Sequence, residues 1–191
     1  MRSPFLELLQ AVGQVFDSLG IGWYLFGAQA ALVHGASRLT ADVDVTVALG
    51  EWETRQLVEA LGDGGFSMRI EDDDFVDRTR VLPVLHLSTG VPADIVLAGP
   101  GIEEQFLARA EIRDLDGVRV PVACAEDVVA MKILAGRPKD IDDAVAILDA
   151  QKATLDLALI RRTLGLLEQA LDQSDLLPAL DSALTRTQTD S

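Results

Sequence analysis

The sequence predicts an α+β fold, with a small mixed β-sheet flanked by helices and a helical bundle at the C-terminal end. Up to about residue 123, short apolar runs typical of strands are interspersed with helical repeats. From about residue 125, the apolar residues follow helical spacing only. Apolar residues make up 49% of the 191, which is enough for a sizeable core. We therefore expect residues 1–123 to form a core domain and residues 124–191 a helical region packed on it.

The first expected element is a helix that begins after Ser3-Pro4, because serine is a favoured N-cap and proline is favoured at the first helical position. Apolar residues then recur at helical spacing as far as Phe16, and Gly20 is a stop signal. The other elements expected before residue 123 are strands at 23–26, 42–47, 66–70, 81–87, 94–97 and 118–122, helices at 28–34, 51–61 and 102–110, and a solvated acidic loop at 71–74.

The C-terminal region reads as four helices. The first ends at Gly136, and Pro138 starts the second. In the second, apolar residues fall at i, i+3, i+4 and i+7, which makes a narrow stripe. The third spans about 154–171 and the fourth begins near Ser174.

Charge and composition exclude several classes of function. Lys and Arg number 16 and Asp and Glu number 31, so the net charge is −15. Such a surface repels long duplex nucleic acid, which is held through basic residues on phosphates. No apolar run approaches the roughly 20 residues that span a membrane, and the N-terminus lacks the pattern of a signal peptide. The single cysteine, Cys124, reads as a small buried residue. We expect a cytoplasmic protein.

The alternation of Asp42-Val-Asp44-Val-Thr-Val47 predicts a strand with two carboxylates on one face and valines in the core. The two Cα atoms would lie about 6.5 Å apart. Carboxylates held rigidly in this way can bind Mg²⁺ or Mn²⁺. The alternative is an Asp-x-Asp pair that is merely solvated.

Three further features favour a phosphate-handling site. Gly27-Ala28 is a strand-to-helix turn, where backbone N–H groups can bind phosphate. Arg38 and Thr40 lie between this turn and the carboxylates. Asp94 opens a later apolar strand and would be a third acid if that strand lies beside 42–47.

This combination resembles the DNA polymerase β-like nucleotidyltransferase superfamily. The stretches 26–44, 126–132 and 137–143 are similar to the branch that holds bacterial abortive-infection and toxin–antitoxin nucleotidyltransferases and small antibiotic nucleotidyltransferases. The resemblance covers roughly residues 20–150 and makes residues 1–123 the nucleotidyltransferase core. One departure is Ala28, where the superfamily usually has Ser or Gly at the turn, so one hydrogen bond to phosphate is lost.

The resemblance also implies roles for individual residues. Asp42, Asp44 and Asp94 would be catalytic metal ligands, and Gly27, Ala28, Arg38 and Thr40 would bind the nucleotide. Lys132 would face the triphosphate, with Arg137, Lys139 and Asp140 nearby. Two alternatives stay open from the residues themselves. Lys132 can extend its stem to solvent near a helix end, and Lys139 can pair with Asp143 at i, i+4.

Two classes of function follow. The first is an enzyme that transfers NMP from an NTP to an acceptor hydroxyl on a tRNA end, a protein or a small molecule. The resemblance also implies that such an enzyme could be the toxin of a toxin–antitoxin system, with an antitoxin as its partner. The second is a non-catalytic module with a relaxed site that binds a nucleotide or a protein. Three acids without a cation would repel one another, which favours the enzyme.

Overall fold

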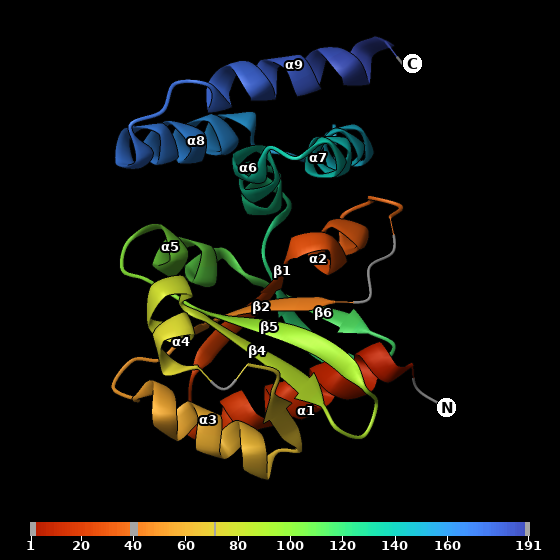
Figure 1. The fold of residues 1–191 in the computed structure, drawn as a ribbon. Helices are drawn as coiled ribbons and strands as arrows, with labels where there is room; N and C mark the ends of the chain where they lie inside the picture. Colours follow the sequence, from red (N-terminus) through yellow and green to blue (C-terminus); the bar gives the residue numbers. More distant parts are fainter. Residues whose placement is uncertain (1–2, 39–41, 71, 190–191) are drawn as a thin grey trace. The chain divides into compact units, whose positions relative to one another are not determined.

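A computed structural model describes residues 3–38, 42–70 and 72–189 of the chain (Figure 1). The chain divides into two compact units. The sheet unit comprises the described residues of Met1–Phe26 and Thr40–Ala123, and the helical unit those of Gly27–Leu39 and Cys124–Ser191. The α+β fold class is confirmed, with a mixed sheet and flanking helices.

A mixed sheet forms the centre of the sheet unit. In the described residues it has seven strands in the order β3-β4-β5-β2-β1-β7-β6. The β2–β5 and β1–β7 pairs are parallel and the other pairs are antiparallel. The strands are β1 Gly22–Phe26, β2 Val43–Ala48, β3 Phe66–Met68, β4 Val81–His86, β5 Val91–Leu97, β6 Glu111–Leu115 and β7 Val118–Val122; the helices of this unit are α1 Pro4–Leu19, α3 Thr54–Asp63, α4 Asp73–Thr79 and α5 Ile102–Arg109.

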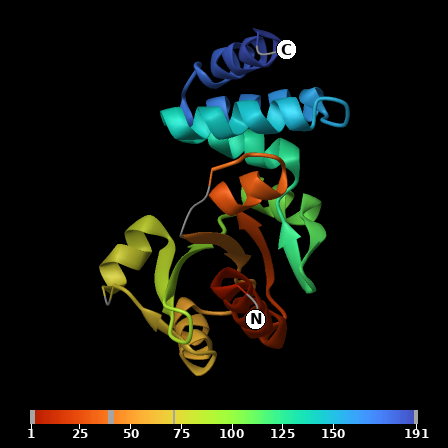
Figure 2. The ribbon, with the colours of Figure 1, turned by 90° about the vertical axis from the view of Figure 1, so that its right-hand side faces the viewer.

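One face of this sheet carries the core. Val43, Val45 and Val47 of β2 are completely buried, as the alternation predicts. Helices α1 and α3 cover this face, and both views show them on the same side of the sheet (Figures 1 and 2). A methyl group added at Gly13 of α1 would lie 3.2 Å from the Trp23 ring, so the helix approaches the sheet closely at that glycine.

The first helix begins and ends where the sequence predicts. The Ser3 hydroxyl accepts a hydrogen bond from the Leu6 N–H at 3.3 Å, and Pro4 takes the first helical position. Gly20 ends the helix with a φ of 65°, a left-handed conformation that favours glycine.

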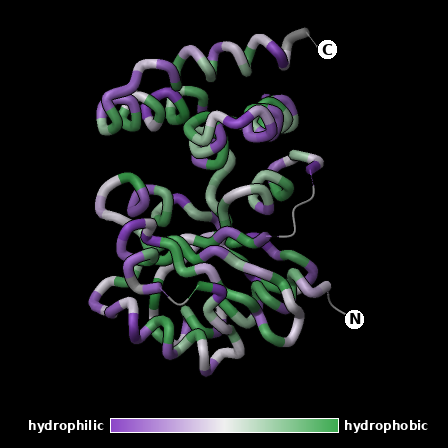
Figure 3. Tube along the Cα trace, in the orientation of Figure 1, coloured by the Kyte–Doolittle hydropathy of each residue, from purple (hydrophilic) through white to green (hydrophobic). Residues whose placement is uncertain are grey.

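The helical unit consists of short α2 and four longer helices, and hydrophobic residues recur through it as they do through the sheet unit (Figure 3). Each unit therefore has apolar residues for a core of its own. The unit's completely buried residues include Ala144, Ile147, Ile160 and Leu164. The bounds are α2 Gly27–Val33, α6 Ala125–Ala135, α7 Pro138–Ala150, α8 Leu157–Leu171 and α9 Leu176–Thr189.

The clearest differences from the sequence-based expectation concern α4, β6 and β5. The acidic stretch expected as a loop contains the start of α4, because the Asp72 carboxylate caps that helix by accepting from the Phe75 N–H. Strand β6 was not predicted, since its residues are mostly exposed and do not alternate. Strand β5 begins at Val91, three residues before Asp94. None of the helices in the described part of the chain is long and apolar enough to cross a membrane.

Replacing Gly35 by alanine should destabilise the protein. Gly35 has a φ of 116°, and an added Cβ would lie 2.5 Å from the Cβ of Ala150. Both the backbone strain and the clash oppose the substitution, at a cost of about 1–3 kcal/mol. The free energy of unfolding from denaturant titration measures the effect.

The matched control is Gly165→Ala in α8, where nothing lies within 4 Å of the added Cβ. This change should stabilise the protein by up to about 1 kcal/mol, because alanine favours a helix over glycine. Equal effects of the two substitutions would contradict the described backbone at Gly35.

Candidate active site

Strands β2 and β5 bring two of the predicted acids together. They pair in parallel, and Asp44 is the register partner of Asp94. Register partners on neighbouring strands point to the same face, and such strands lie about 4.8 Å apart. Both carboxylates leave the face opposite the buried valines, and both residues are only partly buried. The pair is thus two adjacent carboxylates on the sheet face opposite the buried valines.

Asp42 lies one residue before β2 and is exposed. Residues 3–38, 42–70 and 72–189 contain no group of three or more His, Cys, Asp or Glu side chains arranged to hold a metal ion. The structure therefore pairs Asp44 with Asp94 but does not gather Asp42 with them into such a group. The donor set itself fits Mg²⁺ or Mn²⁺, because carboxylate oxygens are the ligands these ions prefer. The metal-ligand roles of the three acids stay predictions.

Arg69 also belongs to this site, although the sequence analysis did not single it out. It directly follows β3, and its backbone N–H donates to the carbonyl oxygen of Pro83 at 2.8 Å. Pro83 is the register partner of Asp94. The Arg69 guanidinium donates to Oδ1 of Asp94 and forms an ion pair with it. In the sequence, Arg69 is marked only by its position after a short apolar strand. Cations are so common at the ends of strands that this position does not indicate a site.

The predicted phosphate turn lies at the start of α2. Gly27 has a φ of 68°, and Ala28 is buried. A left-handed φ at this position explains why the turn has a glycine. Thr40 lies outside the described residues. The nucleotide-binding roles of Gly27, Ala28 and Thr40 stay predictions.

Lys132 is buried in an ion network of the helical unit. Its Nζ donates to Oδ1 of Asp140 at 3.0 Å and to Oδ2 of Asp143 at 2.7 Å. The three side chains are only 6%, 1% and 5% exposed. A lysine this deeply buried does not extend its stem to solvent, so that alternative is wrong. The network ties α6 to α7, since a buried ammonium requires nearby carboxylates.

Two arginines extend this network. Arg38 donates from one terminal nitrogen to Asp143 at 3.3 Å, while its Nε is buried with no hydrogen-bond partner among the described residues. Arg137, the N-cap residue of α7, donates to Oδ2 of Asp140. Asp143 is thus paired with Lys132 and Arg38, and Lys139 is exposed. The predicted nucleotide contacts of Arg38, Lys132, Arg137, Lys139 and Asp140 stay predictions.

The network changes the acidity of Asp140. Burial alone would raise the pKa of this carboxyl, but hydrogen bonds and ion pairs from Arg137 and Lys132 outweigh that effect. The pKa of Asp140 therefore lies below its ordinary value. The carboxylate stays ionised at neutral pH and holds its two cationic partners.

Burial shifts the pKa of both Cys124 and His86. Burial, together with the neighbouring Asp127, raises the pKa of Cys124 to about 12, so the thiol stays protonated. Burial lowers the pKa of His86, whose ring nitrogens lie 2.8 Å from the Thr89 hydroxyl and 3.2 Å from that of Ser88. Cys124 is buried, as predicted.

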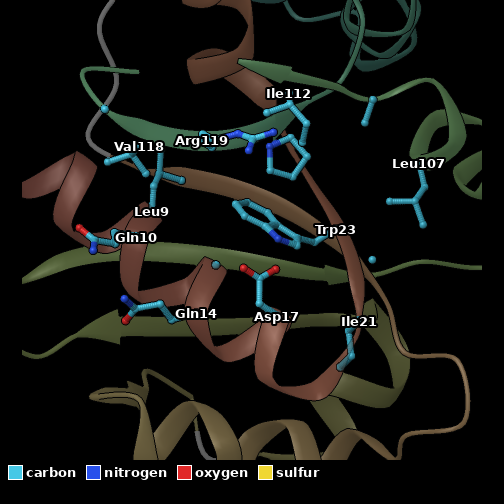
Figure 4. A pocket seen from close by; sticks show the side chains of 15 residues that line it. Leu9, Gln10, Gln14, Asp17, Ile21, Trp23, Leu107, Ile112, Val118 and Arg119 are labelled. Carbon is cyan, nitrogen blue, oxygen red and sulfur yellow. The ribbon is translucent and has the colours of Figure 1, made fainter. Parts of the chain in front are cut away.

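A pocket of about 680 Å³ lies in the sheet unit between α1, the start of β1 and the β6–β7 hairpin (Figure 4). Trp23, Asp17 and Arg119 line it. Asp44 pairs with Phe26 at the other end of β1, and none of the three predicted acids lines this pocket. The pocket is therefore separate from the carboxylate pair.

Residues 5–164 match a family described as nucleotidyltransferase of unknown function (DUF6036). The chain belongs to this nucleotidyltransferase family. The match spans the acids and the ion network alike, and the resemblance to nucleotidyltransferases drawn from the sequence is confirmed. No curated protein sequence matches the chain.

Solved structures similar to this member of the nucleotidyltransferase family carry related names. The antibiotic-resistance factor ANT(2'')-Ia has a TM-score of 0.62 at 13% identity, covering 90% of this chain and 95% of its own. An antigenic nucleotidyltransferase-like protein from Paracoccidioides brasiliensis has a TM-score of 0.57 at 18% identity, and the match covers 94% of this chain and 91% of that protein. The lincosamide antibiotic adenylyltransferase LnuA has a TM-score of 0.52 at 12% identity, and the match covers 77% of this chain and 96% of that protein. At these identities the likeness establishes the fold.

Replacing Asp140 by asparagine should destabilise the protein by about 3 kcal/mol, because it removes one carboxylate from the buried Lys132. The loss should depend on pH. Since the folded pKa of Asp140 is lowered, its contribution is full above the ordinary aspartate pKa of about 3.9 and is lost as the pH falls below it. Denaturant unfolding at several pH values measures the difference between wild type and variant.

Asp149→Asn serves as control, because Asp149 is an exposed aspartate on the same helix. Its effect should stay within about 0.5 kcal/mol. A difference between wild type and Asp140→Asn that does not shrink between about pH 4 and pH 2 would contradict the assignment.

Proposed function

We propose that this protein is a nucleotidyltransferase that uses Mg²⁺ or Mn²⁺ to transfer NMP from an NTP to an acceptor hydroxyl. The acceptor oxygen forms a bond to the α-phosphorus, the bond from that phosphorus to the bridging oxygen breaks, and pyrophosphate leaves. The proton of the acceptor hydroxyl passes to a carboxylate, for which Asp94 is the proposed base. Atoms and charge balance without any further reactant.

The residues divide into two proposed sets. Asp42, Asp44 and Asp94 hold the metal, which when bound would neutralise phosphate charge and stabilise the leaving oxygen. The second set binds the triphosphate and supplies backbone N–H groups and cations. Its members are Gly27, Ala28, Arg38, Thr40, Lys132, Arg137, Lys139 and Asp140.

The observation that carries this proposal is the register of Asp44 with Asp94 in a chain of a nucleotidyltransferase family. The like charge of these adjacent carboxylates is offset in part by Arg69 at Asp94, and a divalent ion would neutralise the pair further. Further support comes from the Nε of Arg38, a buried donor with no hydrogen-bond partner among the described residues, which a phosphate oxygen would satisfy.

The acceptor is proposed as a small molecule, a protein or a tRNA end. Two of the similar structures support a small molecule, because one was solved with adenylyl-2''-tobramycin and another with lincomycin. A toxin role with an antitoxin partner is proposed from the sequence resemblance, and a cytoplasmic location from the composition of the chain. The acidic net charge of −15 argues against long duplex nucleic acid as acceptor.

Asp44→Asn should abolish nucleotide transfer, because it removes a carboxylate from the pair. Protein is incubated with each α-labelled NTP, Mg²⁺ and one acceptor class at a time: an aminoglycoside and lincosamide mixture, total tRNA, or cell protein. Labelled acceptor should form with wild type and fall below about 1% of that level with the variant.

The matched control is Asp63→Asn, which changes an exposed aspartate at the end of α3 and should leave transfer intact. No transfer to any class, together with no Mg²⁺-dependent NTP binding, would instead indicate a non-catalytic module.

Asp94→Asn tests the proposed base. NTP should still bind, whereas turnover should drop by about 10²–10⁴-fold, because a general base contributes that much. Equilibrium binding of a labelled NTP and single-turnover kinetics separate the two effects. Turnover that survives the change would show that Asp94 does not take the proton.

A further inference from the structure

The Arg69 guanidinium lies at the carboxylate pair because of strand register. Its backbone is bonded to Pro83, Pro83 is opposite Asp94, and Asp94 is opposite Asp44. These residues form one row across neighbouring strands, so their side chains share a face. A short edge strand thus delivers a fixed positive charge to the row of acids.

This charge occupies an oxygen that the proposed function assigns to the metal. Arg69 donates to Oδ1 of Asp94, and no further ion pair of Asp94 is found within the described residues. A divalent ion ligated by Asp94 would face the guanidinium at the same carboxylate. Two cations at one carboxylate repel each other, so they compete.

The Arg69–Asp94 pair is open to exchange. Both side chains are 38% exposed, whereas the Lys132 network is nearly closed to solvent at 1–6%. An exposed ion pair is screened by water and contributes little to stability. The fold therefore does not depend on this pair, and Arg69 can leave Asp94 without the loss of a core interaction.

We propose that Arg69 is a positioning residue that holds Asp94 in the nucleotide-free protein and competes with the divalent ion for it. This inference rests on the proposed function. Binding of the ion by the free protein is weakened by Arg69, so the ion is held firmly only when triphosphate oxygens complete its ligands.

The test is the Mn²⁺ affinity of the nucleotide-free protein, followed by electron paramagnetic resonance of free Mn²⁺. Arg69→Ala should bind Mn²⁺ about two- to fivefold more tightly than wild type, which is the range expected from an exposed ion pair. Arg69→Gln should tighten Mn²⁺ binding to the same extent. Because glutamine keeps more of the side chain, this variant provides the test if the alanine variant folds poorly. Thermal unfolding checks that each variant is folded.

Arg55→Ala is the matched control. Arg55 lies on α3 in the same unit, pairs with Glu59 at 3.8 Å and is 81% exposed. The Arg55→Ala substitution also removes one positive charge, but Arg55 is not paired with Asp94. The Mn²⁺ affinity of this variant should therefore stay at the wild-type value. In a protein that already carries Asp94→Asn, adding Arg69→Ala should not change the Mn²⁺ affinity.

The outcomes separate the two claims. If Asp44→Asn weakens Mn²⁺ binding but Arg69→Ala and Arg69→Gln match wild type, the competition by Arg69 is refuted and the metal site stands. The same refutation follows if Arg69→Ala tightens binding equally in the Asp94→Asn background. If wild type binds no Mn²⁺ with or without NTP, both this inference and the proposed function are overturned.

Discussion

The parallel pairing of β2 with β5 is the constraint on which the site depends. It brings Asp44 beside Asp94 from segments fifty residues apart in the chain. Val43, Val45 and Val47 hold the register, because each is fully buried on the opposite face. A slip of one residue would turn Asp44 into the core and move the valines to the opposite face, and burying an unpaired carboxylate is costly. The core thus determines where the carboxylates point.

The charged side chains fall into two groups with different physical roles. Lys132, Asp140 and Asp143 form a buried network in which loss of one member leaves an uncompensated charge. Arg69 and Asp94 form an exposed pair whose exchange costs the fold little. The first group holds α6 and α7 together, while the second is the pair that we propose a divalent ion competes for. The distinction comes from solvent exposure, since both groups consist of the same kinds of side chain.

Local patterns predicted the parts of the fold that local physics determines. The alternation along 42–47 predicted strand β2 and its buried valines, and Ser3-Pro4 and Gly20 predicted the ends of α1. The polar edge strand β6 escaped prediction because neither of its faces is buried enough to produce alternation. Arg69 escaped because its partner is set by the pairing of β3, β4 and β5, which no local spacing encodes. Arg38 and Asp143 are likewise joined over 105 residues.

The most direct test of the account is a crystal of the protein grown with Mn²⁺ and a non-hydrolysable NTP. We expect an anomalous Mn²⁺ peak about 2 Å from carboxylate oxygens of both Asp44 and Asp94, with the nucleotide phosphates on the same ion. Nucleotide bound without a metal at these two residues, or Mn²⁺ bound only elsewhere, would contradict the claim that they form the metal site.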